Sequence, residues 1–382
     1  MNYKTKKEIK RRRYQLKRMR RTMKRQSKSY KLRRRHRLEN RRRGLVEQLK
    51  WERKAYVELE VPKNFSFIDN TNEILEYFIK CKSLLHNKEK VQCDLSHITA
   101  LSSDAIALLA ACANDESFLG KRGRIRGNAP TDPELLKLFT ESGFYNHVKA
   151  TKVLKSAHKS DTNLFHQESN YQVQSDIAKN ACILGTKHVF GSNKPFPDLY
   201  EMLIEAMSNT NNHASNNSNA NQFKWWLYTY NAPNGHTMYT FIDLGVGIFD
   251  SIPVQVFKKI KRVIGLENNT DLVPDLLDGK IKSREKVDNK IRGKGIPQIA
   301  VNSNSQYFAR AYIISNDVKI NLKDKTAEAL EHNFSGTMLF WELTNGDTTN
   351  KIITDFILLK TNYLCKTEPS THPKMQNFFG TL

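Results

Sequence analysis

Cysteine is scarce in this sequence of 382 residues. Its five cysteines are scattered, odd in number and never in Cys-x-x-Cys spacing, which argues against both a disulfide framework and a zinc site. They are Cys81, Cys93, Cys112, Cys182 and Cys365. We expect small buried thiols in a reducing, cytoplasmic setting.

Long apolar runs are also missing, because no stretch of eighteen consecutive apolar residues occurs. The sequence therefore predicts no membrane span and no membrane as a partner. The N-terminus carries charge without an apolar segment behind it, so we expect no secretory signal. With 39% hydrophobic and 10% aromatic residues, the chain can still bury the cores of about two domains.

Acidic residues are almost absent from the first 44 positions. Residues 1–43 contain 8 Lys and 14 Arg against Glu8 and Glu39, so they hold +20 of the total charge of +23. The arginine clusters are Arg11, Arg12 and Arg13, then Arg33, Arg34 and Arg35, then Arg41, Arg42 and Arg43. We interpret residues 1–44 as a basic arm, mostly disordered when free and helical on a polyanion.

The arm favours nucleic acid as a partner, because arginine pairs with phosphate through two hydrogen bonds and each neutralised phosphate releases counterions. Nothing in the arm reads bases. An acidic protein or membrane surface, or no dedicated target at all, remain alternatives.

Residues 55–150 alternate between strand and helix patterns, which is typical of a small α/β domain. We predict strands at 56–61, 91–95 and 122–126, and helices at 71–85, at 103–113 and from Asp132, a suitable N-cap. A polar stretch at 151–184 reads as a linker. Residues 346–382 are expected to be a C-terminal extension of unassigned role.

The segment 197–213 predicts a helix with two distinct faces. Its apolar face carries Leu199, Met202, Leu203, Ala206 and Thr210. Glu205, Asn209 and His213 are four residues apart and share another face. The Asn209 amide oxygen suits Mg²⁺, and the Glu205 carboxylate can orient or deprotonate a nucleophile.

Two strands, at 223–230 and 237–242, flank the turn Ala232-Pro-Asn-Gly235 and predict a hairpin that ends at Asp243. The Asp243 carboxylate can accept a hydrogen bond from an adenine amino group. Gly245 and Gly247 allow close approach of the backbone to a ligand.

A second glycine box, Arg292-Gly293-Lys294-Gly295, opens a predicted helix whose Pro297 lies near its first turn. The amides and positive charges of this box suit a triphosphate. Thr337 then stands at the start of an apolar strand, 338–343.

In this order the motifs resemble the GHKL ATPases with their Bergerat fold, over residues 185–345. The resemblance implies ATP and Mg²⁺ as ligands, Glu205 as the catalytic carboxylate, Asn209 as the Mg²⁺ ligand and Asp243 as the adenine reader. It places His213, Gly245, Gly247, Arg292, Gly293, Lys294, Gly295 and Thr337 at the ATP site. It also implies a lid over 260–289, unusually long, and a homodimer as an expectation.

Glu205-Ala-Met-Ser-Asn209 is most similar to the anti-sigma-factor serine kinases, whose partners are STAS domains. The segment Asp94-Leu-Ser-His-Ile98, continuing to Ser103, resembles a STAS domain, which implies a protein partner and makes Ser103 a candidate phosphorylation site. Ser102, Asp104 and Ala105 depart from that pattern. The alternative for Ser103 is an N-cap of the following helix.

The sequence thus predicts an α/β protein: a Bergerat-fold ATP-binding domain preceded by a small STAS-like domain and a basic arm. Three functions remain open. They are an ATP-hydrolysing switch that governs nucleic-acid binding, a serine/threonine kinase acting on a STAS domain, and an ATP-binding module without turnover. The carboxylate of Glu205 does not separate the first two, because it can activate either water or a hydroxyl.

Overall fold

The computed structural model describes residues 3–120, 124–156, 162–167, 173–213, 224–252, 268–281 and 295–346. The chain divides into two compact units, residues 1–55 and residues 56–382. No helix in the described part of the chain combines the length and the apolar character needed to cross a bilayer.

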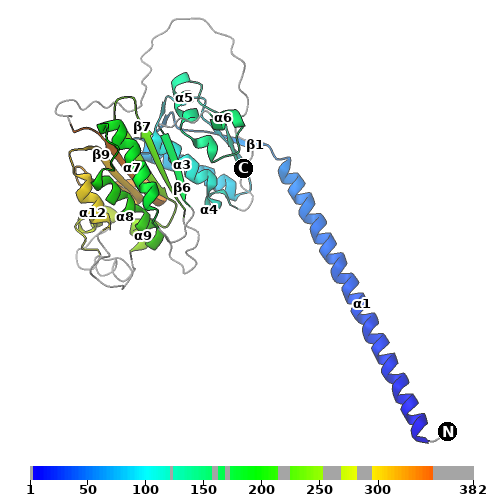
Figure 1. The fold of residues 1–382 in the computed structure, drawn as a ribbon. Helices are drawn as coiled ribbons and strands as arrows, with labels where there is room; N and C mark the ends of the chain where they lie inside the picture. Colours follow the sequence, from blue (N-terminus) through cyan, green and yellow to red (C-terminus); the bar gives the residue numbers. More distant parts are fainter. Residues whose placement is uncertain are drawn as a thin grey trace, which may run out of the picture. The chain divides into compact units, whose positions relative to one another are not determined.

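The first unit is one helix, α1 (Tyr3–Glu52), of 50 residues (Figure 1). The structure differs here from the predicted disordered arm, because the arm is helical and its helix continues to Glu52. Lys, Arg, Leu, Met and Gln all have high helix propensity, and the segment contains no proline. Local propensity therefore favours the helix, while charge repulsion opposes it.

The second unit begins with the predicted α/β part. Strands β1 (Tyr56–Glu60), β3 (Lys90–Asp94) and β5 (Arg124–Gly127) form a parallel sheet in the order β1-β3-β5. A second parallel pair joins β2 (Asn64–Phe65) to β4 (Ala100–Leu101). The helices are α2 (Thr71–His86), α3 (Ser103–Asn114), α4 (Glu116–Leu119) and α5 (Pro133–Glu141), followed by the 3-10 turn η1 (Phe144–Asn146).

These elements confirm the predicted alternation of strands and helices, and they confirm the cap at Asp132. The Asp132 carboxylate accepts hydrogen bonds from the backbone N–H groups of Glu134 (2.9 Å) and Leu135 (3.0 Å). Such a carboxylate satisfies amides that have no partner inside the helix.

Residues 151–184 are not simply a linker, as predicted, because they contribute a strand to a second sheet. After α6 (Lys152–Ser156), strand β6 (Thr162–Gln167) pairs antiparallel with β7, and α7 (Ser175–Phe190) follows. β6 lies at the edge of that sheet and has a single strand neighbour. An edge strand needs no continuous apolar run, so its polar sequence resembled a linker.

The second sheet is antiparallel, with the order β6-β7-β8-β10-β9. β7 (Trp225–Asn231) and β8 (Thr237–Asp243) form the predicted hairpin. β10 (Thr326–Leu343) contains the strand predicted at 338–343 but is much longer, and its partner β9 (Phe308–Asn321) was not predicted.

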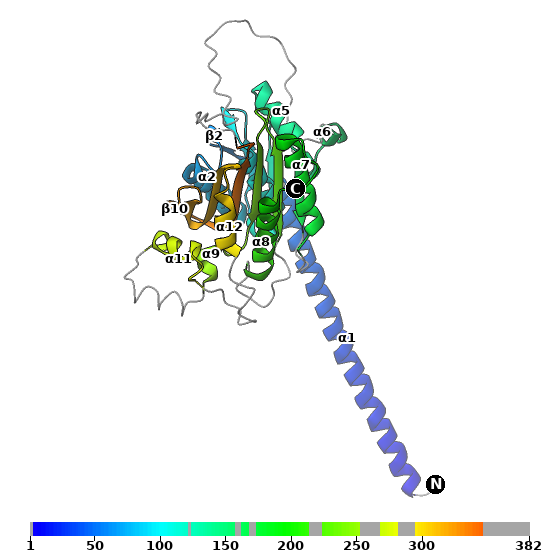
Figure 2. The same cartoon turned by 60° about the vertical axis from the view of Figure 1, so that its left-hand side comes forward.

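Helices cover both faces of this second sheet (Figures 1 and 2). One face, with Trp225, Phe241 and Trp341, packs in a core with residues of α7, α8 (Pro197–His213) and α12 (Gly295–Ser303). That core also takes residues of α9 (Ile248–Ser251), η2 (Asn269–Leu272) and α11 (Val273–Leu277).

The opposite face, with Trp226 and Ile242, shares a core with the α/β part. Helix α3 contacts β7 and β8 and is buried from Ser103 to Ala113. The two parts predicted as separate domains are therefore joined through α3 in a single mixed α/β unit, whose described residues form two parallel sheets and one antiparallel sheet.

Candidate nucleotide-binding site

Helix α8 has the two faces that the sequence predicts, and its bounds are those predicted. Its apolar face, from Leu199 to Thr210, is at most 3% exposed. Glu205 and Asn209 are half-buried on another side. His213 is the last residue of α8, and its side chain lies outside the described residues.

The start of α12 lies directly against the polar face of α8. A Cβ atom on Gly295 would be 2.8 Å from both side-chain amide atoms of Asn209 and 3.0 Å from Glu205 Oε2. Only a glycine permits this approach without displacing those groups. Two motifs some 90 residues apart in sequence therefore meet in the folded chain. The other residues of the box, Arg292, Gly293 and Lys294, lie outside the described residues, as do residues 260–267 and 282–289 of the expected lid. The rest of that segment, 268–281, contains η2 and α11 and contributes to the core.

The Asn209 side chain carries a polar atom that the described residues do not satisfy. Its Nδ2 is buried and has no hydrogen-bond partner in the part of the chain that the structure describes. The described residues contain no group of three or more His, Cys, Asp or Glu side chains able to hold a metal ion. An unsatisfied amide N–H group suits an acceptor such as a phosphate oxygen, and the Oδ1 atom of the same amide is the kind of ligand that Mg²⁺ takes beside water and phosphate oxygens.

Glu205 has a carboxyl group of raised pKa. Burial is the main cause, and the neighbouring Glu201 carboxylate adds to it. Glu201 in turn accepts a hydrogen bond from Asn302 Nδ2 on α12 (3.1 Å). A carboxylate of raised pKa is a better proton acceptor than an ordinary surface glutamate.

Asp243 ends β8 and is 6% exposed. Its Oδ1 accepts a hydrogen bond from the Gly245 N–H (2.9 Å), and its Oδ2 accepts one from the Thr210 hydroxyl (3.3 Å). Burial raises the pKa of Asp243 to about 6, while these hydrogen bonds oppose the rise. Thr337 on β10 is its register partner, so the sheet places these two predicted site residues side by side.

The turn after Asp243 is fixed by two polar residues of β9 that sequence reasoning missed. Asn316 accepts a hydrogen bond from the Phe249 N–H (3.0 Å) and donates one to the Val246 carbonyl (3.0 Å). Its side chain occupies the space that a Cβ atom on Gly247 would need. Gly247 also has a φ of +83°, which favours glycine there.

Ser315 completes this attachment, since its hydroxyl accepts from the Ile248 N–H (2.8 Å) and donates to the Gly336 carbonyl (2.8 Å). Ser315 and Asn316 are buried polar residues that directly follow the buried apolar pair Ile313-Ile314 in β9. The change from apolar to polar residues after Ile314 was the available signal.

Ser103 is 6% exposed in the first turn of α3. The N-cap is Ser102, without a side-chain capping bond, so the alternative role of Ser103 as N-cap is wrong. Asp104, which departs from the STAS pattern, is buried and accepts hydrogen bonds from the N–H groups of Phe67 (2.6 Å) and Ile68 (3.0 Å). Asp104 thus holds the loop between β2 and α2 in place. Ser103 is buried and is not presented to solvent.

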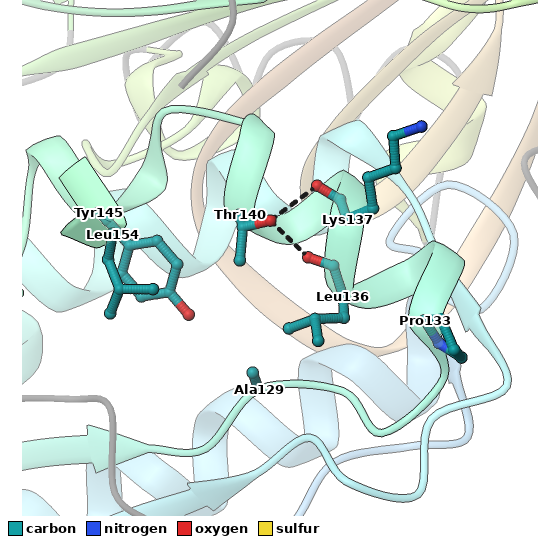
Figure 3. Close-up of a pocket in the computed structure, with 7 residues that line it drawn as sticks. All are labelled: Ala129, Pro133, Leu136, Lys137, Thr140, Tyr145 and Leu154. Atoms are coloured by element: carbon teal, nitrogen blue, oxygen red, sulfur yellow. Dashed lines mark hydrogen bonds between the residues drawn. The ribbon is translucent and has the colours of Figure 1, made fainter. Parts of the chain in front are cut away.

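A separate hollow of about 280 Å³ lies beside α5 (Figure 3). It is lined by Ala129, Pro133, Leu136, Lys137, Thr140, Tyr145 and Leu154. The Thr140 hydroxyl bonds to the carbonyls of Leu136 and Lys137 (2.9 and 3.0 Å), so it is already engaged. None of the predicted site residues lines this hollow.

The predicted arm arginines all lie on α1, which is exposed along almost its whole described length. Comparison of the chain with protein-family models gives no match, and comparison with curated proteins gives none either.

Proposed function

We propose that the chain binds ATP at the meeting point of α8, α12 and the end of β8, and that it hydrolyses ATP there. The observation that carries this proposal is the contact of Gly295 with Asn209 and Glu205. A carboxylate, an unsatisfied amide and the N-terminus of a helix converge at this contact. Such a set suits a polyphosphate with its cation.

Each residue has one task in this proposal. Asp243, held by Thr210 and Gly245, accepts a hydrogen bond from the adenine amino group. Asn209 offers its amide oxygen to Mg²⁺, which would neutralise phosphate charge when bound. Glu205 accepts a proton from the attacking water, and its raised pKa suits that role near neutral pH.

We further propose that nucleotide turnover is linked to binding of nucleic acid by α1. The charge of +20 in residues 1–43 supports a polyanionic partner, since most such affinity comes from phosphate contacts. The second unit has nearly balanced charge. The arm therefore supplies the electrostatic attraction to nucleic acid. Binding and hydrolysis of ATP at the site supply the change of state that is linked to it.

The kinase alternative has no exposed acceptor at Ser103, because this residue is only 6% exposed in the first turn of α3. A STAS domain of another protein remains a candidate acceptor. The raised pKa of Glu205 favours turnover over the alternative of a passive ATP-binding module, since a base is not needed for binding alone.

The test is an ATP-turnover assay on the full chain, with and without duplex DNA or RNA, together with calorimetric titration of ATP. The proposal expects binding, Mg²⁺-dependent phosphate release and a changed rate when nucleic acid is added. Binding without phosphate release would instead support the passive module. Loss of ATP with a matching mass gain on an added STAS domain would support the kinase. No heat of binding would refute the site.

A further inference from the structure

Helix α1 is strongly basic, but it also contains a heptad repeat of large nonpolar or aromatic residues. Ile9, Leu16, Met23 and Tyr30 recur every seven residues, and each is followed by a lysine. Those lysines are Lys10, Lys17, Lys24 and Lys31. A spacing of seven residues keeps one stripe facing a partner helix when two helices supercoil.

Between residues 15 and 30 the two sides of α1 differ completely in charge. At 3.6 residues per turn, every basic residue of this stretch falls on one half of the circumference. They are Lys17, Arg18, Arg20, Arg21, Lys24, Arg25 and Lys28. The other half carries only uncharged side chains: Gln15, Leu16, Met19, Thr22, Met23, Gln26, Ser27, Ser29 and Tyr30. We call this half the uncharged face.

The uncharged face is open in the single chain. Leu16 is 56% exposed and Met23 is 62% exposed. A shallow groove lies at its edge, lined by Gln15, Met19, Thr22, Met23 and Gln26 of this face and by Arg18 of the basic half. Beyond Tyr30 the face ends, because Arg33, Arg34 and Arg37 fall on the same half of the helix.

We propose that the uncharged face packs against the same face of a second copy of α1. A nucleic-acid backbone requires positive charge, which this face lacks. A lipid surface requires a broad apolar face, whereas here Gln, Thr and Ser alternate with the apolar residues. Another α1 offers the matching heptad spacing and no charge to repel. In such a pair of α1 helices the two basic halves face outward, so that one dimer can bind two stretches of phosphate backbone.

The contact between the two uncharged faces is short, and the basic halves of the two helices repel each other. Screening is strong in about 1 M salt, where the Debye length falls to about 3 Å. The dimer is therefore expected at high salt without any nucleic acid. High salt therefore distinguishes pairing of two α1 helices from binding of nucleic acid by α1, because phosphate binding weakens under the same conditions.

The experiment is sedimentation equilibrium of the full chain in about 1 M NaCl. Its variant is Leu16→Lys with Met23→Lys, which places two charges on the uncharged face. The matched control is Tyr14→Lys with Leu32→Lys, which adds the same charge and removes as many apolar side chains from the basic side. Lysine is a good helix former, and circular dichroism verifies that both variants keep α1.

We expect a dimer for the unaltered chain and for the control, and a monomer for the Leu16/Met23 variant. Oxidative cross-linking of Met23→Cys, with Leu32→Cys as control and Cys365→Ser in both, is an independent measurement: only the first should form a covalent dimer. A monomeric unaltered chain at high salt would overturn the proposal. So would a dimer that both double variants retain, because another surface would then hold it.

Discussion

The Thr210 hydroxyl donates a hydrogen bond to the Asp243 carboxylate, joining helix α8 to the end of strand β8. This bond connects the helix that carries Glu205 and Asn209 to the proposed adenine-reading residue. Thr210 lies on the buried face of α8, where the sequence pattern indicated only packing. The contact therefore gives a packing residue a role in positioning Asp243.

Removing that bond should weaken ATP binding without unfolding the protein. Thr210→Val keeps the shape of the side chain but leaves one carboxylate oxygen without its donor. A hydrogen bond to a charged group contributes about 1.5–3 kcal/mol, so we expect ATP affinity to fall by about tenfold. Calorimetry of Thr210→Ser, which restores the hydroxyl, is the control. Equal affinity in the valine variant would show that Thr210 only packs.

Asp243→Asn should reduce ATP affinity by at least about tenfold, because the amide can present a donor where the adenine amino group needs an acceptor. Titration calorimetry measures this change. Asp324→Asn, in the turn between β9 and β10, is the matched control. Unchanged affinity in the Asp243 variant would refute the proposed adenine contact.

The same residue predicts how stability depends on pH. The pKa of Asp243 is raised from 3.8 to about 6, so the folded state binds its proton more tightly than the unfolded state does. The free energy of unfolding should therefore fall as pH rises from about 4 to about 7, by about 3 kcal/mol from this group. Urea unfolding at both ends of that range should show this decrease reduced in Asp243→Asn. An identical pH dependence in the two proteins would contradict it.

Glu205→Gln should bind ATP within about threefold of the unaltered protein but lose turnover by about 100-fold or more, the scale of general base catalysis. Because the pKa of Glu205 is raised, turnover in the unaltered protein should decline as pH falls, before an ordinary glutamate would be protonated. Phosphate release measures both effects, with Glu134→Gln on α5 as control. Equal phosphate release by Glu205→Gln would remove Glu205 from the chemistry.

Gly295→Ala should impair ATP binding, because the new Cβ atom needs the space of the Asn209 amide at 2.8 Å. We expect at least about a tenfold loss of affinity, from displacement of a group that contacts the ligand. Gly44→Ala is the control, since a Cβ atom there meets nothing within 4 Å. A Gly295→Ala protein with full affinity would place the ligand away from α12.

Deleting residues 1–43 should remove salt-sensitive binding to duplex DNA while leaving ATP affinity unchanged. An arm that neutralises about six phosphates gives a slope near −5 when log affinity is plotted against log salt concentration. Substituting glutamine for Arg33, Arg34 and Arg35 should make that slope shallower by about 3. Fluorescence anisotropy at several salt concentrations measures it. A flat salt response in the full chain would argue for a different partner.

The sequence by itself determined the elements whose signals are local. Helix α8 has its predicted bounds because apolar spacing and a starting proline define it, and the β7–β8 hairpin follows from its turn residues. Asp132 caps α5 for the same reason. Glu205, Asn209 and Asp243 were proposed as site residues from local signals too, namely residue type and spacing.

Only the tertiary structure decided which of these parts meet. The approach of Gly295 to Asn209, the bond from Thr210 to Asp243 and the anchoring of the glycine turn by Asn316 all join residues distant in sequence. β6 escaped prediction because an edge strand has one strand neighbour and tolerates polar residues. The burial of α3 likewise depends on its packing against the second sheet. No local pattern encodes that packing, because it is a property of two surfaces brought together by folding.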